Sequence, residues 1–218
     1  MSELASEPTS ALASEPLAVL SRLRRQPAPP AEPSVERCEM CTADVGEVHS
    51  HVVDLEGRNL LCTCRPCYLL FTASGAGGGR YRCVPDRWLE VTDLALAPGQ
   101  WEGLQLPVGI AFLFRNSTLD RVSAFYPSPA GATESLLPLE AWEEVAAASP
   151  VLASLEPDVE AVLFRVAGDV VECFIVPIDA CYELVGRLRK TWRGFDGGQE
   201  ARASMAAFFD GVVARARR

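Results

Sequence analysis

The chain has 218 residues, of which 49% are hydrophobic and 22% are charged, a composition that supports a folded core and excludes a wholly disordered protein. Its formal net charge of −9 disfavours nonspecific binding to the phosphate backbone of nucleic acid. The sequence has no apolar run of about 18 residues that could span a membrane, and its first residues lack the basic and apolar regions of a signal peptide. We therefore expect a cytoplasmic protein without membrane insertion.

Residues 1–36 form a proline-rich segment. Six prolines fall before residue 35, and the sequence of residues 4–8 is repeated at residues 12–16. Such a composition buries little apolar surface, so it predicts a flexible arm.

Residues 37–88 have the pattern of a small metal-binding module. Residues 48–55 alternate in polarity and contain β-branched side chains, residues 56–59 are typical of a turn, and residues 60–62 return as a second strand. The predicted hairpin lies between two cysteine pairs, which makes the module similar to a zinc ribbon.

Residues 89–218 predict an α+β domain. We expect strands at residues 106–115, 121–126, 159–166 and 170–176, and helices at residues 139–148, 179–192 and 199–218. Residues 127–135 are predicted to be a connection from a strand to a helix, and residues 192–198 a helix end followed by glycines. Along the last helix, Met205, Phe208, Phe209, Val212 and Val213 form an apolar stripe.

A weak internal repeat runs through this domain. Residues 111–115 (AFLFR) match residues 161–165 (AVLFR) at an offset of fifty. Two strand-strand-helix units on one four-stranded antiparallel sheet, followed by a C-terminal helix, would account for the repeat. Chance similarity of two amphipathic hairpins is the alternative.

The cysteines and histidines indicate a metal site. Cys38 and Cys41 form one CxxC pair and Cys64 and Cys67 form another, with twenty-two residues between the pairs. Two such pairs on separate short loops supply the four soft ligands of a tetrahedral zinc or iron site. The predicted ligands are therefore Cys38, Cys41, Cys64 and Cys67.

Three further donors, Cys62, His49 and His51, lie within the same stretch. In one interpretation the four cysteines hold a structural zinc and these three are its neighbours. In a second, one of the three replaces a cysteine as ligand, and in a third the cysteines hold redox iron, as a rubredoxin-like centre or an iron–sulfur cluster. Against rubredoxin, Thr42 and Tyr68 stand where its knuckles carry glycine.

Catalysis is not expected at this site. No HExxH pattern is present, and no Ser-His-Asp set can be assembled, since both histidines belong to the cluster. The remaining cysteines, Cys83, Cys173 and Cys181, fit packed core thiols, with a distant additional metal ligand as the alternative for Cys83.

Several motifs together resemble a known family. They are residues 38–41 (CEMC), 49–51 (HSH), 61–71 (LCTCRPCYLLF), 107–112 (PVGIAF), 125–135 (FYPSPAGATES), 176–182 (VPIDACY) and 192–195 (WRGF). The chain resembles, over roughly residues 35–216, an uncharacterised and mainly actinobacterial family associated with gene clusters for nickel-iron uptake hydrogenases. The resemblance implies an accessory or assembly factor, or a small electron-transfer partner, for a hydrogenase or its maturation machinery.

The sequence thus predicts a metal-binding accessory protein with a structural zinc and a protein partner. An iron-containing electron-transfer protein is the alternative. A zinc-ribbon protein that binds nucleic acid is a second alternative, which the acidic charge disfavours.

Overall fold

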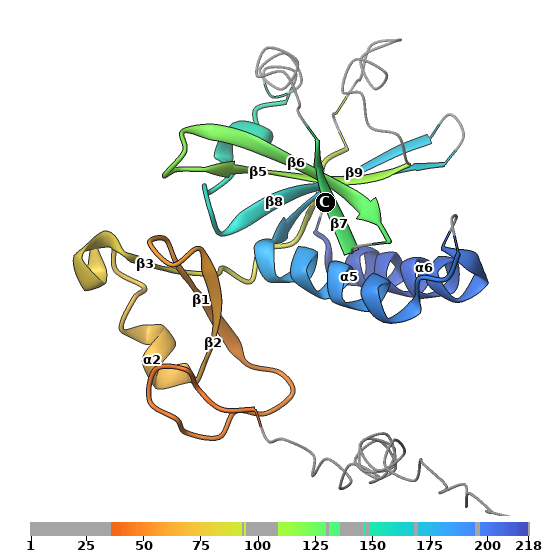
Figure 1. Cartoon of the computed structure of the whole chain (residues 1–218). Coiled ribbons are helices and arrows are strands. Elements are labelled where there is room, and N and C mark those ends of the chain that lie inside the picture. The colour runs from red at the N-terminus through yellow and green to blue at the C-terminus, as the bar shows by residue number, and fades with distance from the viewer. Residues whose placement is uncertain are drawn as a thin grey trace, which may run out of the picture. The chain divides into compact units, whose positions relative to one another are not determined.

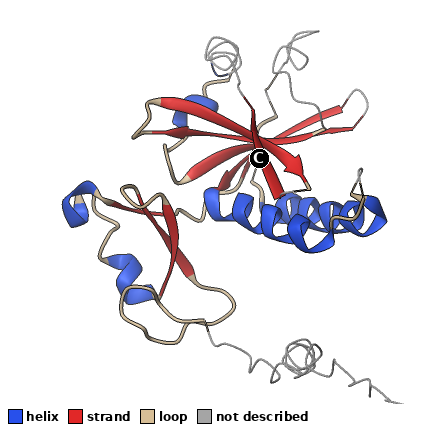
Figure 2. Ribbon diagram, viewed as in Figure 1, coloured by secondary structure: helices blue, strands red, loops and turns tan. Residues whose placement is uncertain are grey.

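The computed structural model describes residues 36–92, 94, 109–129, 131–135, 146, 149–167, 170–194 and 197–217. Residues Glu36–Arg218 form one compact unit, in which the described strands make two antiparallel sheets (Figures 1 and 2). The arm predicted for residues 1–36 lies outside the described residues apart from Glu36, and the helix predicted for residues 139–148 lies outside them apart from Ala146.

The smaller sheet contains the predicted hairpin. Its strands are β1 (Ser50–Asp54), β2 (Asn59–Thr63) and β3 (Tyr81–Cys83), in the order β2-β1-β3. At the hairpin turn, Asp54 Oδ1 accepts hydrogen bonds from the backbone N–H groups of Glu56 (3.1 Å) and Gly57 (3.2 Å). A short helix, α2 (Arg65–Leu69), follows β2, and the 3₁₀ turn η1 (Ala76–Gly79) precedes β3.

The larger sheet has six described strands, not the four that were predicted. They are β4 (Leu89–Glu90), β5 (Ile110–Asn116), β6 (Arg121–Ser128), β7 (Gly131–Ser135), β8 (Glu160–Ala167) and β9 (Val170–Pro177). The order is β4-β9-β8-β5-β6-β7, so the two predicted hairpins lie side by side and β4 and β7 extend the sheet at its two edges. Because the helix of the first predicted unit is not described, the strand-strand-helix repeat stays a prediction.

The segment 127–135 is not a plain connection. It completes β6 and then returns as β7, with Tyr126 opposite Thr133 and Ser128 opposite Gly131. Pro127 lies opposite Ala132 of β7 and beyond Phe125, the last residue of β6 that pairs with β5, which is a position where a proline is tolerated. Gly131 has a φ of +102°, and a Cβ atom on it would lie 2.6 Å from Cγ of Arg189, so the turn lies close to the helix α5 (Ile178–Thr191).

Two helices cover one face of the larger sheet (Figure 1). They are α5 (Ile178–Thr191) and α6 (Gly198–Arg215). Their buried side chains, including Leu184, Leu188 and Phe209, pack on alternate sheet residues, and the opposite face is covered around the 3₁₀ turn η2 (Leu152–Ser154). Because both faces are covered, residues 161–164 of β8 and residues 173–176 of β9 are apolar and buried in succession. Of the predicted stripe on the last helix, Val213 is half exposed and does not belong to the core.

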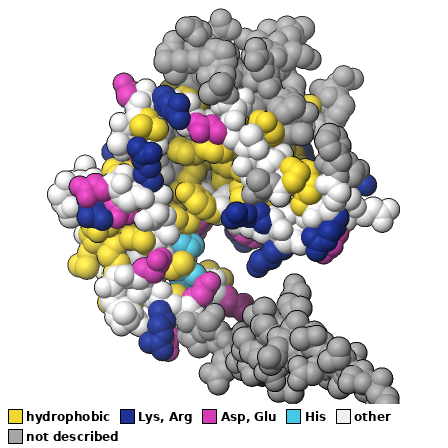
Figure 3. All heavy atoms as spheres, viewed as in Figure 1, with side chains coloured by type: hydrophobic (Ala, Val, Ile, Leu, Met, Phe, Trp, Pro, Cys, Tyr) yellow, Lys and Arg dark blue, Asp and Glu magenta, His cyan; other side chains and the backbone are white. Residues whose placement is uncertain are grey.

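Side-chain contacts connect the two sheets. Arg82 Nη1 lies 3.3 Å from Asp158 Oδ2, and Arg87 Nε lies 2.7 Å from Glu160 Oε1. Near them a groove of about 1310 Å³ is lined from both sides, by Tyr68 of α2 and Tyr182 of α5 among others. The groove is visible as a hollow in Figure 3, where histidine side chains (cyan) reach the surface.

Candidate metal centre

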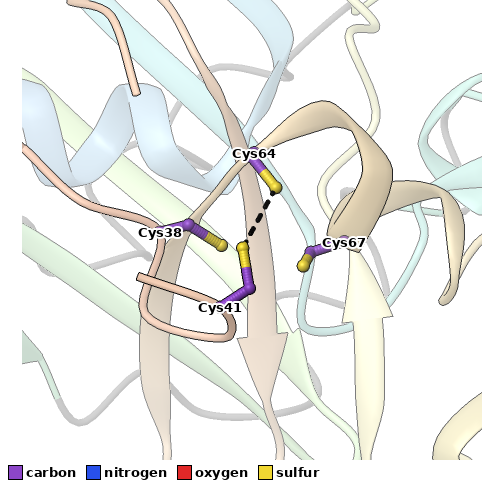
Figure 4. Close-up of side chains that lie close together, drawn as sticks. All are labelled: Cys38, Cys41, Cys64 and Cys67. Atoms are coloured by element: carbon purple, nitrogen blue, oxygen red, sulfur yellow. Dashed lines mark hydrogen bonds between the residues drawn. The ribbon is translucent and has the colours of Figure 1, made fainter. Parts of the chain in front are cut away.

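The four predicted cysteine ligands come together (Figure 4). The Sγ atoms of Cys38, Cys41, Cys64 and Cys67 all lie within 4.8 Å of one another, and those of Cys41 and Cys64 are 3.6 Å apart. Zinc bound tetrahedrally at about 2.3 Å would require sulfur–sulfur distances of about 3.8 Å. The four-cysteine group therefore needs little adjustment to hold one zinc or iron ion.

Two different local structures present these thiols. Around Cys38 the backbone forms a tight turn, in which the Thr42 N–H donates to the Cys38 carbonyl (2.7 Å) and Thr42 takes a left-handed φ of +63°. This is the conformation that a glycine adopts most easily. Cys64 stands immediately before α2, and Cys67 lies within it. The first pair thus forms a knuckle without its usual glycine, whereas the second uses a helical turn.

The surroundings of these thiols shift their pKa values in opposite directions. Burial opposes ionisation of Cys38, but the backbone N–H groups of Cys64, Cys41 and Met40 outweigh it and lower its pKa to about 6. The Cys41 side chain, together with burial, raises the pKa of Cys67 to about 12. Backbone N–H groups aimed at a sulfur stabilise a thiolate, which is the form that ligates a metal.

The three additional donors form a group of their own. The ligand atoms of His49, His51 and Cys62 also lie within 4.8 Å of one another. His51 stands directly opposite Cys62 in the β1–β2 pairing, and the two imidazole rings have centroids 4.7 Å apart. Sequence analysis treated these residues as neighbours of the four cysteines or as replacements for them; the structure brings them together as a second, histidine–cysteine group.

A residue that sequence analysis did not single out contacts this second group. Asp179, in the first turn of α5, places Oδ2 at 2.9 Å from Nδ1 of His51. The two residues are 128 positions apart, so no local pattern could have connected them. The closest signals were the position of Asp179 at the start of the predicted helix 179–192 and its place in the motif of residues 176–182.

The remaining cysteines belong to neither group. Cys173 and Cys181 are buried in the packing on the two faces of the larger sheet. Cys83 donates its thiol hydrogen to the carbonyl oxygen of Tyr68 at 3.0 Å.

A family model, described as a family of unknown function (DUF5947), matches residues 37–216, a stretch that contains both groups of donor side chains. The chain belongs to this family. No curated protein and no solved structure matches it. An activity for this DUF5947 protein must therefore be argued from its own residues.

The groove of this DUF5947 protein lies beside the histidine–cysteine group. His49 and His51 line it, together with Asp179 and, farther along, Trp88. In the part of the chain that the structure describes, we find no helix with the length and apolar character needed to cross a membrane.

Proposed function

We propose that the protein is a cytoplasmic, metal-binding accessory protein in which Cys38, Cys41, Cys64 and Cys67 hold a structural zinc. The observation that carries the proposal is the convergence of four thiols from two short turns. The apolar cluster beside these thiols supports the proposal, because among the described residues its buried members are two of the cysteines and Val45. So small a cluster supplies little hydrophobic stabilisation, and a bound metal would supply the remainder of the folding free energy.

Exposed apolar side chains beside the centre support a protein-interaction role. Leu70, which follows α2 directly, is 68% exposed, Leu69 is half exposed, and Val48 is almost completely exposed. Apolar groups grouped at a surface are typical of contact sites between proteins. The partner that we propose, from the resemblance to a family associated with hydrogenase gene clusters, is a nickel-iron hydrogenase or its maturation machinery.

One observation favours an alternative, in which the same four cysteines hold iron and transfer electrons. Cys41 is exposed, so one ligand of the centre would be at the surface, where a redox partner could approach it. Purified protein with visible absorption and bound iron would support this alternative. Colourless protein with bound zinc would rule it out.

The ligand assignment is tested by measuring the metal content of Cys41→Ser and Cys64→Ser in the full chain. Each variant should lose one equivalent of metal relative to the unmodified protein, and backbone amides of β1–β3 should exchange faster while those of α5 stay protected. Cys83→Ser is the matched control, because a serine hydroxyl can replace the thiol as donor to Tyr68. Equal metal loss in the control would refute the assignment.

The interaction role is tested by co-purification with a recombinant nickel-iron hydrogenase. Leu70→Glu should weaken capture, whereas Val170→Glu, at an equally exposed apolar position on β9, should not. If neither substitution changes the capture of the hydrogenase, the exposed leucines no longer support a protein-interaction role.

A further inference from the structure

We propose that His49, His51 and Cys62 form a second metal site, which binds a divalent transition-metal ion through three protein ligands and leaves a coordination position open. The site is separate from the four-cysteine group, and the proposal does not depend on which metal that group holds.

The pairing of β1 with β2 explains why these three donors meet. His51 lies in β1 and His49 immediately precedes this strand, and the two imidazole rings have centroids 4.7 Å apart. Residue 62 is the direct cross-strand partner of residue 51, and directly opposed side chains lie on the same face of the sheet. The resulting two nitrogens and one sulfur lie within 4.8 Å of one another, close enough to bind a single ion.

Each imidazole ring has a hydrogen-bond partner at Nδ1. Nδ1 of His49 lies 2.8 Å from the carbonyl oxygen of Gly46, and Nδ1 of His51 lies 2.9 Å from the Asp179 carboxylate. Both partners only accept hydrogen bonds, so Nδ1 is the donor in each ring and Nε2 is the nitrogen available to a metal ion. A ligating histidine is normally held in this way, with a carbonyl or carboxylate on its second nitrogen.

His49 Nε2 shows that a partner is required. The His49 side chain is only 8% exposed, and its Nε2 atom is buried without a hydrogen-bond partner among the described residues. A buried polar atom in this position destabilises the fold unless something binds it. A metal ion between the three donors would satisfy it.

The donor set defines the class of metal. Two imidazoles and one thiolate suit Zn²⁺, and also Co²⁺ or Ni²⁺, better than Mg²⁺ or Ca²⁺, which prefer oxygen. Four cysteines fill a tetrahedral shell, whereas three protein ligands leave a position for water or for another molecule. Both histidines line the groove, so a molecule in the groove could supply the fourth ligand.

The first test is the total content of zinc and iron in the full chain after saturation with Zn²⁺ and removal of excess metal. The unmodified protein should hold two equivalents. Cys62→Ala and His49→Gln should each hold one, and Cys83→Ser should hold two. An unmodified protein that never exceeds one equivalent, or a Cys62→Ala variant that still holds two, would overturn the proposal.

The second test measures the metal affinity of the histidine–cysteine group after a substitution at Asp179. This residue would position His51 without touching the metal. Asp179→Asn keeps the shape of the side chain and removes the carboxylate, and should weaken Zn²⁺ or Co²⁺ binding at the histidine–cysteine group by about 10–100-fold. Competition with a chromophoric chelator gives this affinity, and the thiolate absorption of Co²⁺ in the four-cysteine group should stay unchanged. Unchanged affinity, or equal weakening at both groups, would show that Asp179 has a purely structural role.

Discussion

The ion pair between Arg87, in the segment that joins β3 to β4, and the buried Glu160 of β8 allows a direct test of what a buried charge pair contributes to stability. Arg87 Nε lies 2.7 Å from Glu160 Oε1, and the side chains are 32% and 0% exposed. Glu160 Oε2 also accepts the backbone N–H of Glu156 at 2.8 Å. In Arg87→Met the carboxylate would remain buried without its cation, a change that typically costs 3–5 kcal/mol. Because Glu160 can escape part of this penalty by taking up a proton, we expect a loss of about 3 kcal/mol.

The pH dependence of this loss follows from the pKa of Glu160. Burial raises that pKa above the ordinary value for glutamate, and removal of Arg87 should raise it further. The charged form therefore lowers stability above the folded-state pKa. The penalty decreases as the pH falls through that pKa, and disappears below the unfolded value of about 4.3. The loss in Arg87→Met should thus be smaller at about pH 5 than at about pH 7.5.

Urea unfolding of the metal-loaded full chain measures these differences. The double variant Arg87→Met/Glu160→Gln should be more stable than Arg87→Met alone, because it buries no unpaired charge. The control is the exposed pair Arg121–Glu134, at 2.8 Å, where Arg121→Met should cost only about 0–1 kcal/mol. Equal losses in Arg87→Met and Arg121→Met, or no dependence on pH, would refute the reasoning.

Three further outcomes can be checked on the same protein. Arg80 holds the pKa of Asp54 at about 2. The stability that the ionised Asp54 contributes, present above about pH 4, should therefore disappear as the pH falls towards 2. Asp54→Asn should remove this pH dependence from the free energy of unfolding. Gly131→Ala should destabilise the protein by about 1–3 kcal/mol in urea unfolding, given its φ of +102° and the contact with Arg189; unchanged stability would contradict this. Chelation of the metals should accelerate amide exchange in β1–β3 before α5 and α6, and uniform exchange would show that the metals do not stabilise the small sheet locally.

The features that sequence analysis predicted well depend on local patterns. The two CxxC pairs indicated converging thiols because each needs only a short turn, and alternating β-branched residues indicated the hairpin between them. The central strands were evident as apolar runs, because both faces of the larger sheet are covered. The family match over residues 37–216 is consistent with the extent of the resemblance, which left out the proline-rich arm.

The features that were missed depend on contacts between distant residues. Strand β4 has two residues, which are too few to show a periodic pattern. Strand β7 was not predicted because the proline and glycine residues beside it are typical of loops. The division of seven donors into two groups also required the register, since a shift of one residue would place Cys62 opposite a residue other than His51. The pattern of cysteines and histidines alone is compatible with either arrangement.

The contact between Asp179 and His51 shows how the larger sheet contributes to the histidine–cysteine group. Strand β9 ends at Pro177 and α5 begins at Ile178, so the position of the strand determines where the first turn of the helix lies. That turn brings the Asp179 carboxylate to within hydrogen-bonding distance of β1. The four-cysteine group is held by turns within its own module, whereas the histidine–cysteine group also depends on a residue more than a hundred positions away. The two groups should therefore respond differently to changes in the larger sheet, which would alter the histidine–cysteine group first.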